Sequence, residues 1–275
     1  MLRSDVHKSA EAMVAFHEGR VIGPARTILT PKHPLHLRCG RRQLEWGDPL
    51  LLTEVLRQAV IASVHLLAAP AQGSAFIMER MVLSAVGVGP EIGSLGNIEL
   101  VTREEKAESR TASSNRIITH VDFRRGAETF ATGVGHLRIV SRASYVRLRG
   151  AGAFATSADL AASTMEPVGL TPCATPAQPL RWRVGFDPHD SFFFDHPTDH
   201  VPGMLIFEAV RMAAQNVLPD DLCFTGFDGT YCRYVELNED LHVELNTHGG
   251  GASFEVTGAN AVLAARGYLT FASPS

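Results

Sequence analysis

One long apolar run, Leu50 to Ala69, constrains the fold more than any other part of the chain. A run of roughly 20 residues is long enough to cross a bilayer. This one also carries Glu54, Arg57, Gln58 and His65. Because ionisable groups near the middle of a span are costly in hydrocarbon, the run predicts a buried helix of a soluble protein, over about Pro49 to Leu67.

The chain repeats this plan in its second half, where Pro202 to Val217 predicts another strongly apolar helix. Runs rich in β-branched and aromatic residues follow each helix and predict strands. After the first helix they are Ala75–Val88, Ile92–Val101, Asn115–Phe123 and Glu128–Val140. After the second they are Leu222–Val235, Leu241–Asn246, Ala252–Thr257 and Ala261–Phe271.

Two local alignments indicate a duplication. Residues 52–59 match residues 206–213 in the helices and share an E-x-x-R pair, and residues 131–137 match residues 263–269 in the last strand. One apolar helix followed by four strands predicts an antiparallel sheet curled around that helix, which is the hotdog fold. The expected class is α+β, a tandem double hotdog.

Composition divides the two halves and restricts the function. An Ala-, Gly-, Ser-, Thr- and Pro-rich stretch predicts a linker at 150–179, between units at 1–149 and 180–275. Twenty-five Lys and Arg against 29 Asp and Glu give a net charge of −4, which argues against a nucleic-acid or membrane partner. The polar first stretch lacks a signal peptide, and the four cysteines have no C-x-x-C spacing. We expect a cytoplasmic protein with reduced thiols.

The start of the second helix carries the most informative residues. Pro202 suits the first helical turn, Asp199 and His200 precede it, and Gly203 lets a ligand approach the free amides of Gly203 and Met204. Those amides and the positive helix end suit a carbonyl oxygen or an oxyanion. A Pro-initiated helix with an Asp cap and no function explains the same residues, and both interpretations stay open.

Glu208 and Arg211 lie three residues apart and share one face of that helix, among apolar neighbours. Glu54 and Arg57 repeat the pair in the first half. Burying a carboxylate with a guanidinium is costly, so two such pairs indicate a polar active cavity with a glutamate as general base or acid. Structural ion pairs inherited by duplication are the alternative.

Other candidates are weaker. His196 and His200 lie four apart, but Pro197 interrupts the spacing, so we expect His200 to polarise a substrate carbonyl or to cap the helix rather than to bind metal. Gly87–Gly93 has the wrong glycine spacing for a dinucleotide loop. The N-terminal region reads as loop, with its histidines on the solvated surface: His7, His17, His33 and His36.

The string D-H-P-T-D-H-V-P-G-M at 195–204, followed by Glu208 and Arg211, resembles the A-factor synthase (AfsA-type) hotdog family. Val-His-Lys at 6–8 and D-P-L-L-L-T-E-x-x-R-Q-A at 48–59 resemble the family's other signature. Met212 departs from the glutamine that often follows the arginine, whereas Gln58 keeps it.

This resemblance implies an acyltransferase without metal or cofactor. Family members join a β-ketoacyl group, from acyl carrier protein or acyl-CoA, to the hydroxyl of dihydroxyacetone phosphate. The ester is a precursor of γ-butyrolactone, butenolide or furan signalling molecules. The implied catalytic residues are Glu54, Glu208 and Arg211. The implied substrate-binding residues are Arg57, Gln58, His200, Gly203 and Met204.

The expected roles leave choices open. Glu208 or Glu54 deprotonates the hydroxyl, the amides at 203–204 hold the thioester oxygen, and Arg211 or Arg57 holds phosphate or orients its glutamate. We expect the halves to pair as an intramolecular pseudo-dimer, with further homo-oligomers open. A hotdog dehydratase or thioesterase is one alternative, and a non-catalytic binder of acyl or lactone ligands is another.

Overall fold

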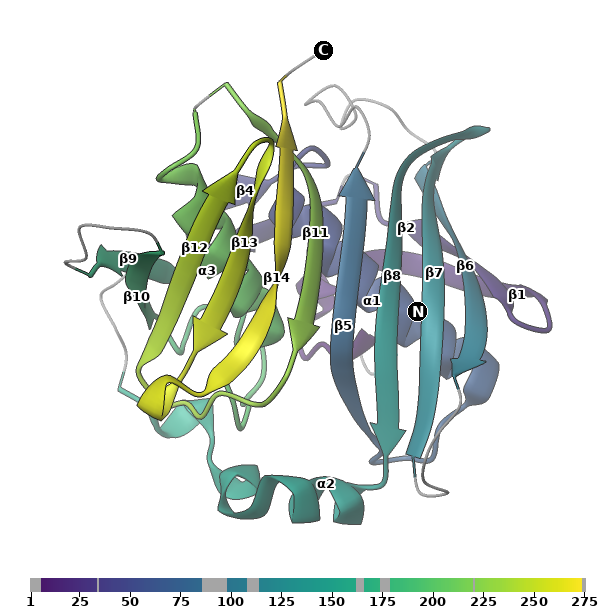
Figure 1. Ribbon diagram of the computed structural model, residues 1–275. Helices are drawn as coiled ribbons and strands as arrows, with labels where there is room; N and C mark the ends of the chain where they lie inside the picture. The colour runs from purple at the N-terminus through teal and green to yellow at the C-terminus, as the bar shows by residue number, and fades with distance from the viewer. Residues whose placement is uncertain are drawn as a thin grey trace. The chain divides into compact units, whose positions relative to one another are not determined.

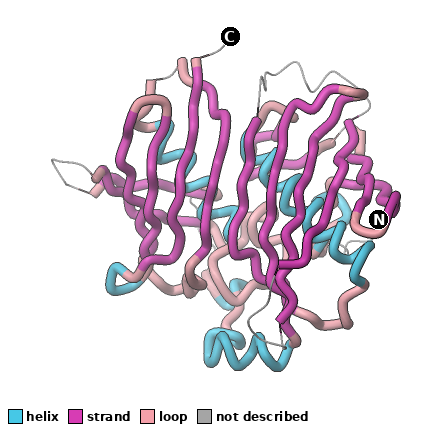
Figure 2. Tube along the Cα trace, turned by 45° about the vertical axis from the view of Figure 1, so that its right-hand side comes forward, coloured by secondary structure: helices cyan, strands magenta, loops and turns pink. Residues whose placement is uncertain are grey.

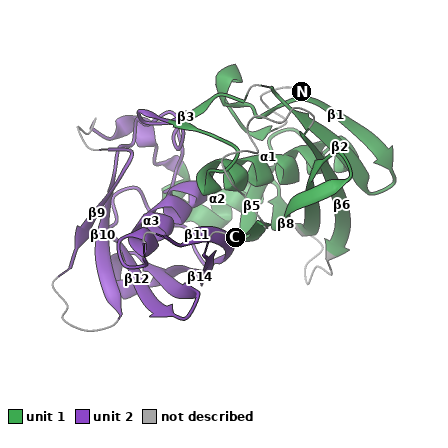
Figure 3. Ribbon diagram, turned by 90° about the horizontal axis from the view of Figure 1, so that it is seen from above, with its two compact units in different colours: residues 1–37, 43–153 green, residues 38–42, 154–275 purple. Residues whose placement is uncertain are grey.

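The computed structural model describes residues 6–33, 35–85, 98–107, 114–161, 166–173, 179–219 and 221–273. The chain forms two compact units, coloured separately in Figure 3. Unit 1 comprises Met1–Leu37 and Gln43–Ala153, and unit 2 comprises Arg38–Arg42 and Phe154–Ser275. The rejected dinucleotide loop at 87–93 lies outside the described residues.

Within its described residues, unit 1 forms a six-stranded antiparallel sheet around the helix α1 (Pro49–Ala68) (Figure 1). The sheet order is β1-β2-β6-β7-β8-β5. The strands are β1 (Phe16–Gly23), β2 (Arg26–Pro31), β5 (Ala75–Ala85), β6 (Ile98–Ala107), β7 (Ser114–Arg125) and β8 (Glu128–Val140). Asp48 caps α1 by accepting a hydrogen bond from the Leu50 N–H at 2.8 Å, and Pro49 follows as the first helical residue.

Two glycines of β8 let α1 approach the sheet. A Cβ at Gly133 would lie 2.4 Å from Leu56 Cδ1, and one at Gly135 would lie 2.6 Å from Val60 Cγ2. Of the described residues, α1 is the one helix long and apolar enough to span a membrane, and 78% of its most apolar window is buried. It packs as the core helix that the sequence predicts.

Unit 2 repeats this layout around α3 (Gly203–Gln215). Its sheet order is β11-β14-β13-β12-β10-β9. The strands are β9 (Val168–Pro172), β10 (Leu180–Phe186), β11 (Cys223–Tyr231), β12 (Leu241–His248), β13 (Gly251–Thr257) and β14 (Leu263–Ala272). Numbered along its own unit, each strand has the same neighbours as its counterpart in unit 1. The predicted tandem hotdog fold is confirmed, and strands, drawn in magenta, make up most of the trace in Figure 2.

Several elements were not predicted. The N-terminal region expected as loop contains β1, β2 and the hairpin of β3 (Leu37–Cys39) and β4 (Arg42–Leu44). β1 has one buried residue, Phe16, so it lacks the alternation that identifies a strand in sequence. The helix α2 (Arg142–Arg149) follows β8, capped by the Ser141 hydroxyl.

The predicted linker at 150–179 is only partly loop. It contains two short 3₁₀ helices, Gly150–Phe154 and Ser157–Asp159, and the edge strand β9, which pairs with β10. Proline and glycine are tolerated in β9 because an edge strand has one unpaired side. The unit division also differs from the predicted boundaries, because residues 38–42 group with unit 2.

Candidate active site

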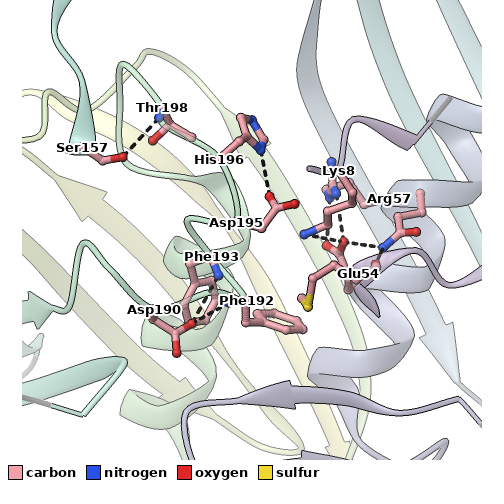
Figure 4. Close-up of polar contacts among 12 residues, drawn as sticks. Lys8, Glu54, Arg57, Ser157, Asp190, Phe192, Phe193, Asp195, His196 and Thr198 are labelled. Atoms are coloured by element: carbon pink, nitrogen blue, oxygen red, sulfur yellow. Dashed lines mark hydrogen bonds and ion pairs between the residues drawn. The ribbon is translucent and has the colours of Figure 1, made fainter. Parts of the chain in front are cut away.

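Glu54 lies in the second turn of α1 and is 1% exposed. The Arg57 guanidinium donates from Nε and Nη2 to the two carboxylate oxygens, both at 2.8 Å. Gln58 Nε2 donates to Oε1 at 2.8 Å, and Lys8 Nζ lies 3.2 Å from the same oxygen. Figure 4 shows Lys8 and Arg57 next to this carboxylate. Three side chains therefore hold Glu54 through four contacts.

These partners determine the charge of Glu54. Burial alone would raise its pKa, but the Arg57 and Lys8 cations and the hydrogen bonds from Arg57 and Gln58 outweigh burial and lower the pKa to about 2. Glu54 is therefore ionised at neutral pH. A carboxylate with so low a pKa accepts a proton poorly, because an efficient general base has a pKa near the working pH.

Gln58 uses its whole amide group within the protein. Its Oε1 accepts a hydrogen bond from the Ala15 N–H at 2.8 Å, and its Nε2 donates to the Met13 carbonyl at 2.9 Å as well as to Glu54. The side chain is fully buried. This geometry holds the segment before β1 against α1, and it suits positioning of Glu54 better than direct contact with a ligand.

Glu208 forms the equivalent network on α3. Arg211 donates from Nε to Oε2 and from Nη2 to Oε1, both at 2.7 Å. Arg42 Nη2 donates to Oε1 at 3.1 Å. Glu208 and Arg211 are both buried, whereas the Arg42 side chain is 43% exposed. The site thus joins a buried ion pair to a cation that reaches solvent.

The β3–β4 hairpin positions Arg42. Gly40 at its turn has φ +55°, a conformation that favours glycine, and a Cβ there would lie 2.6 Å from Pro167 Cγ. The Gly40 N–H donates to Asp190 Oδ2 at 3.1 Å. The other oxygen of Asp190 accepts the N–H groups of Phe192 and Phe193 at 3.0 and 3.3 Å (Figure 4). Asp190 therefore connects the hairpin to the segment that leads into α3.

The start of α3 presents backbone donors. Pro202 is the N-cap, and its carbonyl accepts the N–H groups of Leu205 and Ile206 at 3.0 and 3.2 Å. The N–H groups of Gly203 and Met204 precede these bonds and are the first-turn donors that a developing oxyanion needs. The Tyr231 hydroxyl donates to the Gly203 carbonyl at 3.3 Å, which fixes this turn from β11.

His200 and His196 each pair with the preceding aspartate. His200 Nδ1 lies 2.6 Å from Asp199 Oδ1, and His196 Nδ1 lies 2.7 Å from Asp195 Oδ1. Because an ionised carboxylate only accepts hydrogen bonds, Nδ1 of His200 is the donor in this contact. Asp199 thus orients the ring of His200 just before the start of α3, and polarisation of a substrate carbonyl by His200 stays a prediction.

Neither histidine lies in a metal-binding cluster. Within the described ranges, no three His, Cys, Asp or Glu side chains come together to hold a metal ion. The four cysteines all lie among the described residues, and none of them forms a disulfide bond.

The structure brings the predicted residues together in two sets. In unit 1, Glu54 contacts Arg57 and Gln58. In unit 2, Glu208 contacts Arg211, and residues 200–204 form the approach to the same helix. Sequence reasoning missed the second cation of each set and Asp190. The Val-His-Lys string at 6–8 was a signal for Lys8, whereas no pattern distinguished Arg42 among its neighbouring arginines.

Comparisons with known proteins identify a family, related sequences and a shared fold. The family model described as the A-factor biosynthesis hotdog domain matches residues 6–141 and 170–242. One E-x-x-R pair lies in each matched range.

Two proteins named 2-oxo-3-(phosphooxy)propyl 3-oxoalkanoate synthase are similar to this chain. The one from Streptomyces virginiae is 28% identical over 209 residues, which cover 72% of this chain and 70% of that protein. The one from Streptomyces coelicolor is 28% identical over 226 residues, covering 75% and 68%. The solved 12:0-ACP thioesterase from Umbellularia californica shares the fold, with a TM-score of 0.54, 9% identity and coverage of 92% and 99%.

Proposed function

The chain belongs to the A-factor biosynthesis hotdog domain family, and from this membership we propose that it transfers a β-ketoacyl group from a thioester to dihydroxyacetone phosphate. The thioester is carried by acyl carrier protein or coenzyme A. The product is the 3-oxoacyl ester that the relatives' name describes, a precursor of γ-butyrolactone, butenolide or furan signalling molecules.

The observation that carries this proposal is the Glu208 network. A buried carboxylate held by Arg211 and by the half-exposed Arg42 combines a proton acceptor with cationic groups for an anionic substrate. Acyl transfer also requires a site for the oxyanion, and the first-turn amides of α3 supply it.

In the proposed reaction, Glu208 accepts the proton of the acceptor hydroxyl as its oxygen attacks the thioester carbonyl carbon. The new C–O bond gives a tetrahedral oxyanion, which accepts hydrogen bonds from the N–H groups of Gly203 and Met204. The C–S bond then breaks, and the departing sulfur takes the proton from Glu208 to leave as a thiol. His200, which Asp199 holds through Nδ1, forms a hydrogen bond to a substrate oxygen through Nε2.

Glu208 is the better candidate for the base than Glu54. Four contacts cover the Glu54 carboxylate, and its pKa of about 2 disfavours proton transfer. We assign Glu54, with Arg57 and Gln58, to a fixed network that keeps α1 in place. The cytoplasmic location and the pairing of the two halves stay predictions.

One assay tests the proposal. The purified protein receives a β-ketoacyl thioester with and without dihydroxyacetone phosphate, and mass spectrometry follows thiol and ester. Thiol and ester appearing together only with the acceptor are the expected result. Thiol release without the acceptor indicates a thioesterase, and no turnover indicates a binding protein. A parallel reaction supplies a 3-hydroxyacyl thioester, and loss of water from it indicates a dehydratase. Any of these three results contradicts the proposal.

A further inference from the structure

We propose that Arg42 binds a phosphate group of a substrate while it contacts Glu208. This inference rests on the proposed function and deepens it, because it names the residue that recognises the phosphorylated substrate. The sequence suggested Arg211 or Arg57 for that role. Each of these guanidinium groups instead donates two hydrogen bonds to the glutamate three residues before it. The Arg211 side chain is 6% exposed and the Arg57 side chain is 20% exposed.

The two halves differ at the second cation. In unit 1 the second cation is Lys8, whose side chain is 4% exposed, and Gln58 adds a further donor to Glu54. In unit 2 the second cation is Arg42, and Met212 replaces the glutamine at the equivalent position. The first network is closed by the protein, whereas the second ends in a guanidinium that water and ligands reach.

Guanidinium chemistry suits a bridging role. The group is planar, permanently charged and carries five N–H donors, so it forms hydrogen bonds to a carboxylate and to a phosphate at the same time. Arg42 contacts Glu208 through Nη2, at one end of that group. A phosphate at the solvent side would then be linked through one residue to the carboxylate that we assign as the base.

The hairpin adds positive charge at the same place. Arg38 and Arg41 are exposed on it, and among the residues that the structure describes neither pairs with a carboxylate. Arg38 instead donates to the Arg41 carbonyl at 3.1 Å. Three arginines within five residues contrast with the net charge of −4 for the whole chain. This local charge attracts an anionic group.

The test measures discrimination between phosphorylated and unphosphorylated acceptors. The ratio of kcat/KM for dihydroxyacetone phosphate to kcat/KM for dihydroxyacetone is compared between the wild type and Arg42→Ala, with a donor thioester of N-acetylcysteamine. Loss of a charge-assisted contact predicts that the ratio falls about 10- to 100-fold in Arg42→Ala. Arg42→Lys should recover part of the ratio. Arg183→Ala, which removes an exposed arginine of β10, is the matched control and should keep it.

A second arm distinguishes the source of the phosphate. The same variants are assayed with the donor on acyl carrier protein, whose phosphopantetheine arm carries a phosphate that N-acetylcysteamine lacks. If Arg42→Ala raises KM only for the carrier-bound donor, Arg42 binds the phosphate of the phosphopantetheine arm. If Arg42→Ala lowers the ratio of kcat/KM for dihydroxyacetone phosphate to kcat/KM for dihydroxyacetone, Arg42 binds the phosphate of the acceptor. If Arg42→Ala lowers kcat/KM equally for substrates with and without a phosphate, the inference is overturned.

Calorimetric titration of dihydroxyacetone phosphate separates the two proposals. Weaker binding of dihydroxyacetone phosphate by Arg42→Ala than by the wild type supports phosphate recognition by Arg42. It does so even if no ester forms, because the absence of ester contradicts only the proposed acyl transfer. Ester formation with unchanged acceptor binding and unchanged kinetics contradicts only the role of Arg42.

Discussion

Arg42 Nη2 lies 3.1 Å from Glu208 Oε1, although 166 residues separate the two in sequence. A hairpin from the N-terminal part of the chain therefore completes the ion-pair network of α3. The placement of this hairpin depends on Gly40, which contacts Asp190 through its N–H and lies against Pro167. Substitutions far from Glu208 in sequence should thus alter its surroundings.

Gly40→Ala should disturb the Glu208 network. The new Cβ would sit 2.6 Å from Pro167 Cγ in a left-handed conformation, so strain and overpacking together should lower the free energy of unfolding by about 3 kcal/mol. Displacement of Arg42 should also raise the KM for dihydroxyacetone phosphate. Urea unfolding and ester assays measure both effects. Gly126→Ala is the matched control, because Gly126 has φ +58° with no atom within 4 Å, and equal effects in both variants would refute the role of the Pro167 contact.

Glu208→Gln should abolish most ester formation. Removal of a general base typically costs about 10²- to 10⁴-fold in rate, so we expect a loss of at least about 100-fold in kcat. Mass spectrometry of the ester measures the rate, and circular dichroism checks the fold. Glu255→Gln, on an exposed position of β13, removes the same charge from the surface of unit 2 and should have little effect. Full activity of folded Glu208→Gln would exclude the proposed base.

Glu54→Gln should destabilise the protein. It leaves Lys8, which is 4% exposed, and the partly buried Arg57 without their carboxylate. Removing one partner of a buried ion pair costs about 3–5 kcal/mol. The double variant Glu54→Gln/Lys8→Met removes both charges and should regain part of this loss. A double variant as unstable as the sum of the two single variants would show that Lys8 and Glu54 do not interact.

The low pKa of Glu54 predicts a specific loss of stability in acid. Its pKa is about 2 in the folded state against an ordinary value of 4.5, so between these values the unfolded chain binds more protons. The stabilisation from Glu54 is complete above about pH 5 and disappears as the pH falls towards 2. Linkage over this shift amounts to about 3 kcal/mol. The stability difference between the wild type and Glu54→Gln, measured by urea unfolding, should shrink across this range. A constant difference would mean that the Glu54 pKa is unshifted.

Gly135→Ala should destabilise unit 1, because the new methyl group would lie 2.6 Å from Val60 Cγ2. Overpacking of this kind costs about 1–3 kcal/mol. Val60→Ala creates a space on its own, and the double variant Gly135→Ala/Val60→Ala should be more stable than the sum of the two single effects. Thermal unfolding of all four proteins measures this coupling. Additive effects would contradict the close contact between α1 and β8.

The sequence predicts the parts of the fold that repeat and are strongly apolar. The two core helices and the central strands combine burial with regular patterns, and the duplicated E-x-x-R pairs mark Glu54 and Glu208. β1 and β9 were missed because edge strands with polar or Pro-containing sequences lack an apolar alternation. The contacts of Arg42 and Asp190 depend on a hairpin turn and join residues that lie far apart in sequence. The periodicity of a short stretch of sequence cannot predict such contacts.

The assignment of residues 38–42 to unit 2 has a consequence for how the chain can be divided. A fragment that starts at Phe154 lacks these five residues, which precede α1 in the sequence, and it therefore lacks Gly40 and Arg42. Unit 2 is thus encoded in two separate stretches, and a truncated second half carries Glu208 without the hairpin arginine that contacts it.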